Sequence, residues 1–261
     1  MQPASAGASE RCLSNEGSAG RMRPVVEVEQ AEKAYRVGDR TVRVLQGVEL
    51  TLVPGELVML RGRSGSGKTT LLNLIGGLDE PTGGDVRFGG ASLRGLGDAA
   101  RTALRRSRIG IVFQSAALLP QLSARENVEL SLRLAGTPRR DWRERTEEAL
   151  ELVGLARRAA HRPYELSGGE RQRAAIAKAI AHRPELLLAD EPTAELDSQL
   201  SVRMAALFRR LAREEGLAIC MTTHDETIME VADRVYDMAD GRLVRRTEAA
   251  KDDAAAEGAG G

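Results

Sequence analysis

The sequence predicts an α/β fold in which a mixed β-sheet is flanked by helices. Short apolar runs of strand length alternate with amphipathic helical patterns from Val25 to Val244, and this alternation is typical of the class. A mainly helical stretch at about 115–165 interrupts the alternation. With the helix that follows, it is expected to form a helical subdomain at about 115–185, inside one domain of 25–248.

The expected strands are short apolar runs, and the chain near the N-terminus is expected to form an antiparallel β part. The runs interpreted as strands are Val25–Val28, Leu57–Leu60, Ile109–Phe113, Leu186–Ala189 and Ala218–Thr222. Asp240-Gly241 lies between Val235–Met238 and Leu243-Val244, and this dipeptide is a strong signal for a β-hairpin. No internal repeat is visible, so a single domain of this kind is expected.

Capping patterns place the helices. Ser123 and Glu126 form a capping-box pattern, and Gly136 supplies a C-terminal stop. A second helix is expected over Trp142–Val153, ending at Gly154. A later helix ends at Gly216 and carries its apolar residues on one face, namely Leu200, Met204, Leu207, Phe208 and Leu211.

Composition excludes several classes of protein. Lysine plus arginine equals aspartate plus glutamate at 38 each, so no overall field attracts nucleic acid or an anionic membrane. Cys12 and Cys220 give neither a metal-binding spacing nor a disulfide framework, which favours a reducing cytoplasm. The sequence has no standard signal peptide and no apolar run of roughly 20 residues, so no direct membrane insertion is expected. The Gly-, Ala- and charge-rich ends, 1–24 and 249–261, are expected to be disordered tails.

A glycine-rich segment matches the phosphate-binding loop, or P-loop. Its residues are Gly62, Arg63, Ser64, Gly65, Ser66, Gly67, Lys68 and Thr69. Glycines let successive backbone N–H groups and the following helix N-terminus face phosphate oxygens. Lys68 is expected to contact the β- and γ-phosphates, and Thr69 to bind Mg²⁺. A chance Gly-rich turn is the alternative, but the apolar strand before the loop and the helical pattern after it favour the motif.

Two acids follow the apolar run Leu186–Ala189. Asp190 is therefore expected at the carboxyl end of a strand, where α/β sheets bind ligands. Asp190 suits Mg²⁺ binding, and Glu191 suits polarisation of an attacking water. Paired acids after a strand also occur at ordinary helix starts, and it is the P-loop that favours the catalytic interpretation.

A second glycine-rich string opens another helix, and its residues are Leu166, Ser167, Gly168, Gly169 and Glu170. Alone, Ser167 and Glu170 would indicate only a well-capped helix. Next to a P-loop, however, the string resembles the signature sequence of ABC-type ATPases. The resemblance covers about Val25 to Val244 and implies a P-loop NTPase core that binds ATP and Mg²⁺. It also implies that the signature contacts the γ-phosphate held on an opposite subunit.

The resemblance assigns roles to residues that carry little signal alone. Tyr35 resembles the aromatic residue that stacks on adenine, and Thr70 belongs to the nucleotide-binding segment. Gln114 resembles the Q-loop glutamine, which contacts Mg²⁺ and the water. His224 resembles the switch histidine, and Asp197 the D-loop aspartate at the dimer seam. Without the resemblance, an isolated tyrosine or histidine would more often be structural.

Partners follow from the same resemblance. It implies a second cassette, either an identical chain or a close homologue, and a transmembrane permease that holds the protein at the inner face of the membrane. The strings Leu71–Asp79, Pro81–Gly83 and Leu118–Pro120 resemble bacterial cassettes of lipoprotein release and macrolide export. Those cassettes usually have Gly-Asn ahead of the D-loop, whereas this chain has Ala194-Glu195.

Two alternatives are weaker. A cassette ATPase acting on nucleic acid would carry long coiled coils or two cassettes in one chain, and neither feature is present. A degenerate, nucleotide-sensing scaffold would lack catalytic groups, yet Lys68, Asp190, Glu191 and His224 are all present. The charge-rich stretches 94–108 and 139–148 are interpreted as solvated helical faces.

Overall fold

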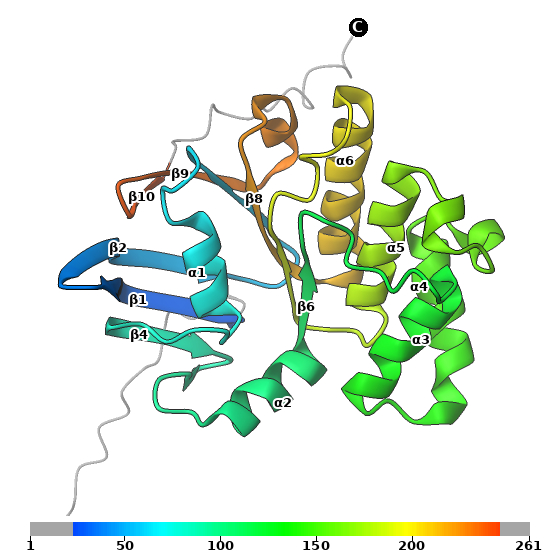
Figure 1. Cartoon of the computed structure of the whole chain (residues 1–261), viewed down its shortest axis with the longest axis horizontal. Coiled ribbons are helices and arrows are strands. Elements are labelled where there is room, and N and C mark those ends of the chain that lie inside the picture. Colours follow the sequence, from blue (N-terminus) through cyan, green and yellow to red (C-terminus); the bar gives the residue numbers. More distant parts are fainter. Residues whose placement is uncertain (1–22, 246–261) are drawn as a thin grey trace, which may run out of the picture.

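A computed structural model of the chain describes residues 23–245 (Figure 1). The expected tail 249–261 and nearly all of 1–24 lie outside these residues. Two sheets organise the fold, one mostly parallel and one antiparallel, and helices pack around them. The predicted α/β class and the antiparallel β part near the N-terminus are therefore confirmed.

The larger sheet has the strand order β10-β9-β3-β8-β7-β6. Its strands are β3 (Leu57–Arg61), β6 (Ile109–Val112), β7 (Leu186–Ala189), β8 (Ala218–Thr223), β9 (Arg234–Ala239) and β10 (Arg242–Arg245). All neighbours pair in parallel except β9 and β10, which form the predicted hairpin. Asp240 and Gly241 both have positive φ, 48° and 74°, as a tight hairpin turn with matching twist requires.

The smaller sheet has the order β2-β1-β4-β5 and is antiparallel throughout. Its strands are β1 (Val26–Val37), β2 (Arg40–Leu52), β4 (Gly83–Phe88) and β5 (Ala91–Ser92). The expectation that the first strand ends at Val28 is wrong, because β1 runs on to Val37. Register shifts along β1 and charged residues after Val28 disrupt the period-two alternation that would reveal this length in the sequence.

Six α-helices and four short 3-10 helices occur within residues 23–245. The α-helices are α1 (Lys68–Ile75), α2 (Asp98–Arg108), α3 (Ala124–Ala135), α4 (Trp142–Leu152), α5 (Gly168–Ile180) and α6 (Ser198–Glu215). The 3-10 helices are η1 (Arg139–Asp141), η2 (Ala156–Arg158), η3 (Pro163–Glu165) and η4 (Glu226–Val231). The predicted capping box of Ser123 and Glu126 starts α3, and Gly136 ends it with a φ of 78°. The helix predicted over Trp142–Val153 ends one residue early, at Leu152.

Two hydrophobic cores lie on opposite faces of the parallel sheet. Alternate residues of β3 separate between them, with Val58 and Leu60 in one core and Leu57 and Met59 in the other, because strand side chains point to opposite faces in turn. The first core holds α1 and the antiparallel sheet, and the second holds the buried faces of α3 to α6. The helix that follows the P-loop is thus separated by the sheet from the helix that follows the signature string (Figure 1).

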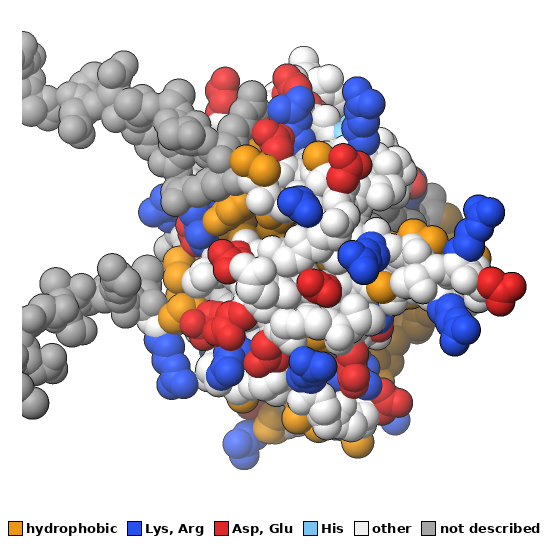
Figure 2. All heavy atoms as spheres, turned by 90° about the vertical axis from the view of Figure 1, so that its left-hand side faces the viewer, with side chains coloured by type: hydrophobic (Ala, Val, Ile, Leu, Met, Phe, Trp, Pro, Cys, Tyr) orange, Lys and Arg blue, Asp and Glu red, His pale blue; other side chains and the backbone are white. Residues whose placement is uncertain are grey.

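The arginines at 94–108 are more than a solvated face. Each of the five donates to another part of the chain: Arg94 to Gly84, Arg101 to Glu80 and Asp98, Arg105 to Gly77 and Thr102, Arg106 to Leu134, and Arg108 to Glu185. Helix α2 has no fully buried residue. It is attached to the body of the molecule by the bonds of its arginines and by Leu104, which packs against the core that holds α1. Figure 2 shows that acidic and basic side chains are interspersed on the face beside the antiparallel sheet.

Candidate nucleotide-binding site

The P-loop connects β3 to α1 and has the backbone shape that its glycines permit. Gly65 and Gly67 adopt φ values of 81° and 108°, which residues with a Cβ adopt rarely. A Cβ at Gly62 would stand 2.4 Å from the carbonyl oxygen of Met238, so only glycine fits against β9. The loop is therefore a curled backbone held against the sheet, as a phosphate cradle requires.

Lys68 lies at the first position of α1 and is 5% exposed. Its Nζ donates to the carbonyl oxygens of Gly62 and Arg63, at 2.7 and 3.2 Å. The ammonium group is thus held over the loop where phosphates are expected to lie. The buried Ser66 Oγ has no hydrogen-bond partner among the described residues, and such an orphaned polar atom fits an additional acceptor in the loop.

Two of the three predicted metal-binding residues, Thr69 and Asp190, lie together. The Thr69 hydroxyl donates to Asp190 Oδ2 at 2.9 Å, and the Thr222 hydroxyl donates to Asp190 Oδ1 at 2.7 Å. Hydroxyl and carboxylate oxygens are ligands that Mg²⁺ prefers, so the Thr69–Asp190 pair fits this ion. Thr222, on β8, belongs to this cluster but was not among the predicted site residues. The polar pair Thr222-Thr223 at the end of an apolar run is its only sequence signal.

Glu191 lies between the groups expected to act with it. Its Oε1 is 3.6 Å from Lys68 Nζ, and its Oε2 is 3.3 Å from His224 Nδ1. The backbone of Glu191 is strained, with a φ of 45°, and its N–H donates to the Thr222 hydroxyl at 2.8 Å. Strain of this kind persists where surrounding contacts hold it, and it concentrates at functional sites.

Tyr35 lies beside α1 on the antiparallel sheet and is 37% exposed. Its hydroxyl donates to Asp79 Oδ2 at 2.8 Å. Burial raises the pKa of Tyr35, the bond to Asp79 raises it further, and the Thr70 hydroxyl opposes both effects. The contact with Thr70, two residues beyond Lys68, places the ring next to the P-loop helix.

The signature string forms the N-terminus of α5. Ser167 is the N-cap, and it exchanges hydrogen bonds with Glu170 in the predicted capping box. The Ser167 N–H is the main reason that the pKa of Glu170 lies below its usual range. Ser167 and Gly168 are exposed, and the hydrogen bonds found for Ser167 within residues 23–245 stay inside α5. The first residues of this helix end are therefore accessible to a ligand.

Gln114 lies near the signature string. A cavity of about 280 Å³ is lined by Gln114, Gly168, Pro192 and Glu195, among others. Asp197 caps α6 by accepting from the Leu200 N–H at 2.9 Å, and its side chain is exposed. The predicted residues thus fall into two groups in one chain, a P-loop group and a signature group.

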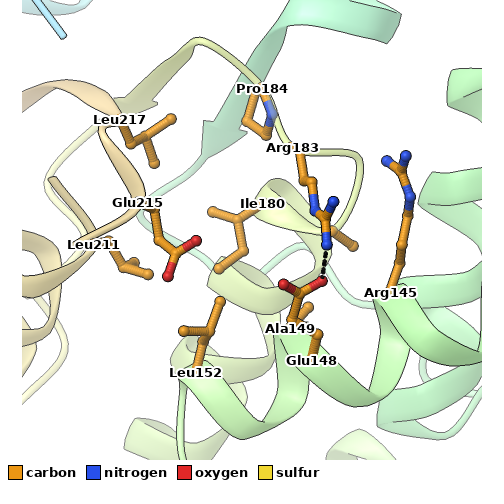
Figure 3. A pocket seen from close by; sticks show the side chains of 11 residues that line it. Arg145, Glu148, Ala149, Leu152, Ile180, Arg183, Pro184, Leu211, Glu215 and Leu217 are labelled. Carbon is orange, nitrogen blue, oxygen red and sulfur yellow. Dashed lines mark hydrogen bonds and ion pairs between the residues drawn. The ribbon is translucent and has the colours of Figure 1, made fainter. Parts of the chain in front are cut away.

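A pocket elsewhere contains none of the predicted residues. It has a volume of about 160 Å³ and lies between α4, the end of α5 and the end of α6 (Figure 3). Leu152, Ile180 and Leu211 supply apolar walls, and Arg183 donates to Glu148 at 2.7 Å at its edge. It brings no nucleophile or metal-ligand cluster together.

The P-loop, the acids at the end of β7 and the histidine after β8 define a P-loop nucleotide-binding protein. A sequence profile described as ABC transporter matches residues 45–194. The chain therefore belongs to the ABC transporter family, as an ATP-binding and ATP-hydrolysing cassette.

Individual relatives agree with this assignment. The chain is 45% identical over 223 residues to the lipoprotein-releasing system ATP-binding protein LolD of Geobacter metallireducens, covering 85% of this chain and 99% of that one. It is 47% identical to the macrolide export ATP-binding/permease protein MacB of Rhodopirellula baltica, covering 83% of this chain but only 32% of MacB. Among solved structures, the ATP-binding cassette MJ0796, a dimer in a post-hydrolysis state bound to ADP and Pi, matches with a TM-score of 0.76 and 38% identity. That match covers 85% of this chain and 97% of MJ0796.

Within residues 23–245, every helix is too short or too polar to cross a lipid bilayer.

Proposed function

We propose that this chain is the ATPase subunit of an ABC transporter and that it works as one half of a cassette pair. The proposed cassette comprises 25–248, with a helical subdomain at about 115–185. The observation that carries the proposal is the contact chain from Thr69 through Asp190 and Thr222 to Glu191 and His224. It gathers the hydrolytic groups of three strands at one edge of the sheet.

The P-loop and the residues around it have separate proposed roles. The backbone of Gly62–Thr70 cradles the triphosphate, Lys68 binds the β- and γ-phosphates, and the Tyr35 ring stacks on adenine. Thr69 and Asp190, with Gln114, would hold Mg²⁺, which neutralises charge on the β- and γ-phosphates when bound.

Glu191 is the proposed base for hydrolysis. It orients a water and accepts its proton as the water oxygen bonds to the γ-phosphorus and the bond to the β-phosphate oxygen breaks, leaving ADP and phosphate. The contact between Glu191 and Lys68 must break when Lys68 binds the γ-phosphate. His224 lies on the other carboxylate oxygen, where it holds Glu191 and contacts the γ-phosphate.

A partner cassette supplies the missing half of the site. The N-terminus of α5, where Ser167 and Gly168 are exposed, is proposed to bind the γ-phosphate held by the partner's P-loop. Leu166, Gly169 and Glu170 complete this signature segment. Asp197 is proposed to lie at the seam. Because ATP adds contacts across the seam and hydrolysis removes them, the pair closes and opens with each turnover.

Transport across the membrane would be carried out by a permease that this chain drives. The names of the relatives, a lipoprotein-releasing system and a macrolide exporter, support a cytoplasmic position on the inner face of the membrane through such a partner. The names of these two relatives refer to different substrates. Similarity to them therefore does not identify a transported substrate for this chain. Co-purification of a membrane protein with the tagged chain would test the pairing.

Glu191→Gln tests the cassette mechanism. The variant should form ATP-dependent dimers by light scattering, because the substrate persists, while phosphate release falls to background. Glu185→Gln is the matched control, since Glu185 precedes the same strand and pairs with Arg108 away from the site. A Glu191→Gln chain that turns over ATP normally as a monomer would refute the proposal.

A further inference from the structure

Lys33 and Asp79 form a partly buried ion pair beside Tyr35. Lys33 is 8% exposed, and its Nζ donates to Asp79 Oδ1 at 2.5 Å and to the carbonyl oxygen of Glu80 at 2.7 Å. Lys33 pairs with Leu45 across the sheet, and a Cβ on Gly67 would stand 2.9 Å from Leu45 Cδ2. The strand that pairs with the Lys33 segment of β1 therefore packs against the P-loop.

The same two residues hold the Tyr35 ring. Asp79 accepts from the Tyr35 hydroxyl at 2.8 Å with its second oxygen, which fixes the far end of the side chain. Lys33 Nζ lies 4.9 Å from the ring centroid, over one face, where a cation is attracted by the π-electrons. One face of the ring is thus covered by Lys33, and a base can stack only on the other.

We propose that Asp79 and Lys33 are positioning residues for the adenine subsite: they fix Tyr35 so that one face of its ring stays free and aimed at the nucleotide base. The proposal rests on the proposed function, in which Tyr35 stacks on adenine. The lysine also draws electron density from the ring, which favours stacking of an electron-rich base on the opposite face.

The chemistry of Asp79 agrees with this geometry. Burial alone would raise its pKa, but the hydrogen bonds from Lys33 and Tyr35 outweigh burial and hold the pKa below its usual range. The carboxylate therefore stays ionised at neutral pH and accepts from both neighbours at once. An ordered stacking platform loses less entropy on binding than a free side chain does.

Comparison of Mg·ATP with inorganic tripolyphosphate tests the proposal, because tripolyphosphate has the phosphates but no base. The full chain is titrated with each by calorimetry. Tyr35→Phe removes the hydroxyl that binds Asp79 and leaves the Lys33–Asp79 pair intact. Stacking contributes between about fivefold and a hundredfold to affinity. Loss of the Tyr35–Asp79 hydrogen bond should therefore raise the Kd for ATP by roughly 3- to 10-fold. The Kd for tripolyphosphate should be unchanged.

Asp79→Asn should give the same selective loss, with a raised KM for ATP and an unchanged kcat. Glu80→Gln is the matched control, because the carboxylate of Glu80 pairs with Arg101 and only its backbone oxygen binds Lys33. Equal loss of ATP and tripolyphosphate binding in Asp79→Asn would mean a general structural effect and would overturn the proposal. So would wild-type ATP affinity in Tyr35→Phe.

Two results with the wild-type chain separate this proposal from the one it rests on. If ATP and tripolyphosphate bind equally tightly, the base contributes nothing to affinity. The proposed role of Asp79 and Lys33 is then rejected, while the P-loop function stands. If neither binds, both proposals fail.

Discussion

Thr69 and Asp190 are joined directly, since the Thr69 hydroxyl donates to Asp190 Oδ2 at 2.9 Å across the gap between α1 and the end of β7. The two residues are 121 positions apart in the chain. This bond links the phosphate loop to the strand that carries Glu191. A shift of the loop would therefore act directly on the residue next to the proposed catalytic acid.

The first prediction concerns metal dependence. Asp190→Asn removes the negative charge while keeping an oxygen that accepts from Thr69. Loss of one carboxylate beside a metal typically lowers metal affinity about 10- to 100-fold, so ATP affinity measured with Mg²⁺ should fall. In EDTA, where only phosphate contacts contribute, variant and wild type should bind ATP alike. An equal loss in both conditions would contradict the assignment.

The second prediction compares two similar helix caps. Ser167 and Ser123 are both N-caps within complete capping boxes, one at the signature helix and one at α3. Replacing either with alanine should cost about 1 kcal/mol in unfolding free energy. Only Ser167→Ala should also reduce ATP-dependent dimerisation and turnover, measured by light scattering and phosphate release. If Ser123→Ala lowers turnover as much, the effect of Ser167 is merely structural.

The third prediction tests how closely β6 packs on α5. A Cβ on Gly110 would stand 2.4 Å from the carbonyl oxygen of Ala179 and 2.9 Å from Leu187 Cδ1. Because a backbone oxygen cannot move aside as a side chain does, Gly110→Ala should destabilise the fold by about 1–3 kcal/mol in urea denaturation. Gly97→Ala is the control: its Cβ would meet no atom within 4 Å, leaving only a small capping effect. Equal urea midpoints for the two variants would contradict this close packing of β6 on α5.

The fourth prediction concerns Cys220, which is fully buried on β8. Burial raises the pKa of its thiol to about 12, so almost no thiolate exists at pH 8. In a Cys12→Ser variant, a disulfide reagent should therefore label Cys220 only at the rate at which the protein opens, and quickly in guanidinium. Cys220→Ala, which keeps Cys12, provides the reference rate. Fast labelling of Cys220 in the folded chain would show that β8 is exposed to solvent.

The sequence by itself determined the elements and motifs whose signal is local. The P-loop, the capping boxes of Ser123 and Ser167, the hairpin at Asp240-Gly241 and the strand Leu186–Ala189 each depend on residues a few positions apart. Periodicity and capping chemistry act over such distances, so these features are legible without a structure.

Only the tertiary structure decided which distant residues meet. Thr222 lies 32 positions from Asp190 and Lys33 lies 46 from Asp79, and no spacing rule predicts either contact. The length of β1 depended on pairing with β2 and β4 rather than on its own irregular pattern. The separation of the P-loop from the signature also came from the sheet that stands between α1 and α5. A local sequence pattern reflects the secondary-structure propensity and the chemistry of its residues. Contacts between distant elements are set by how those elements pack.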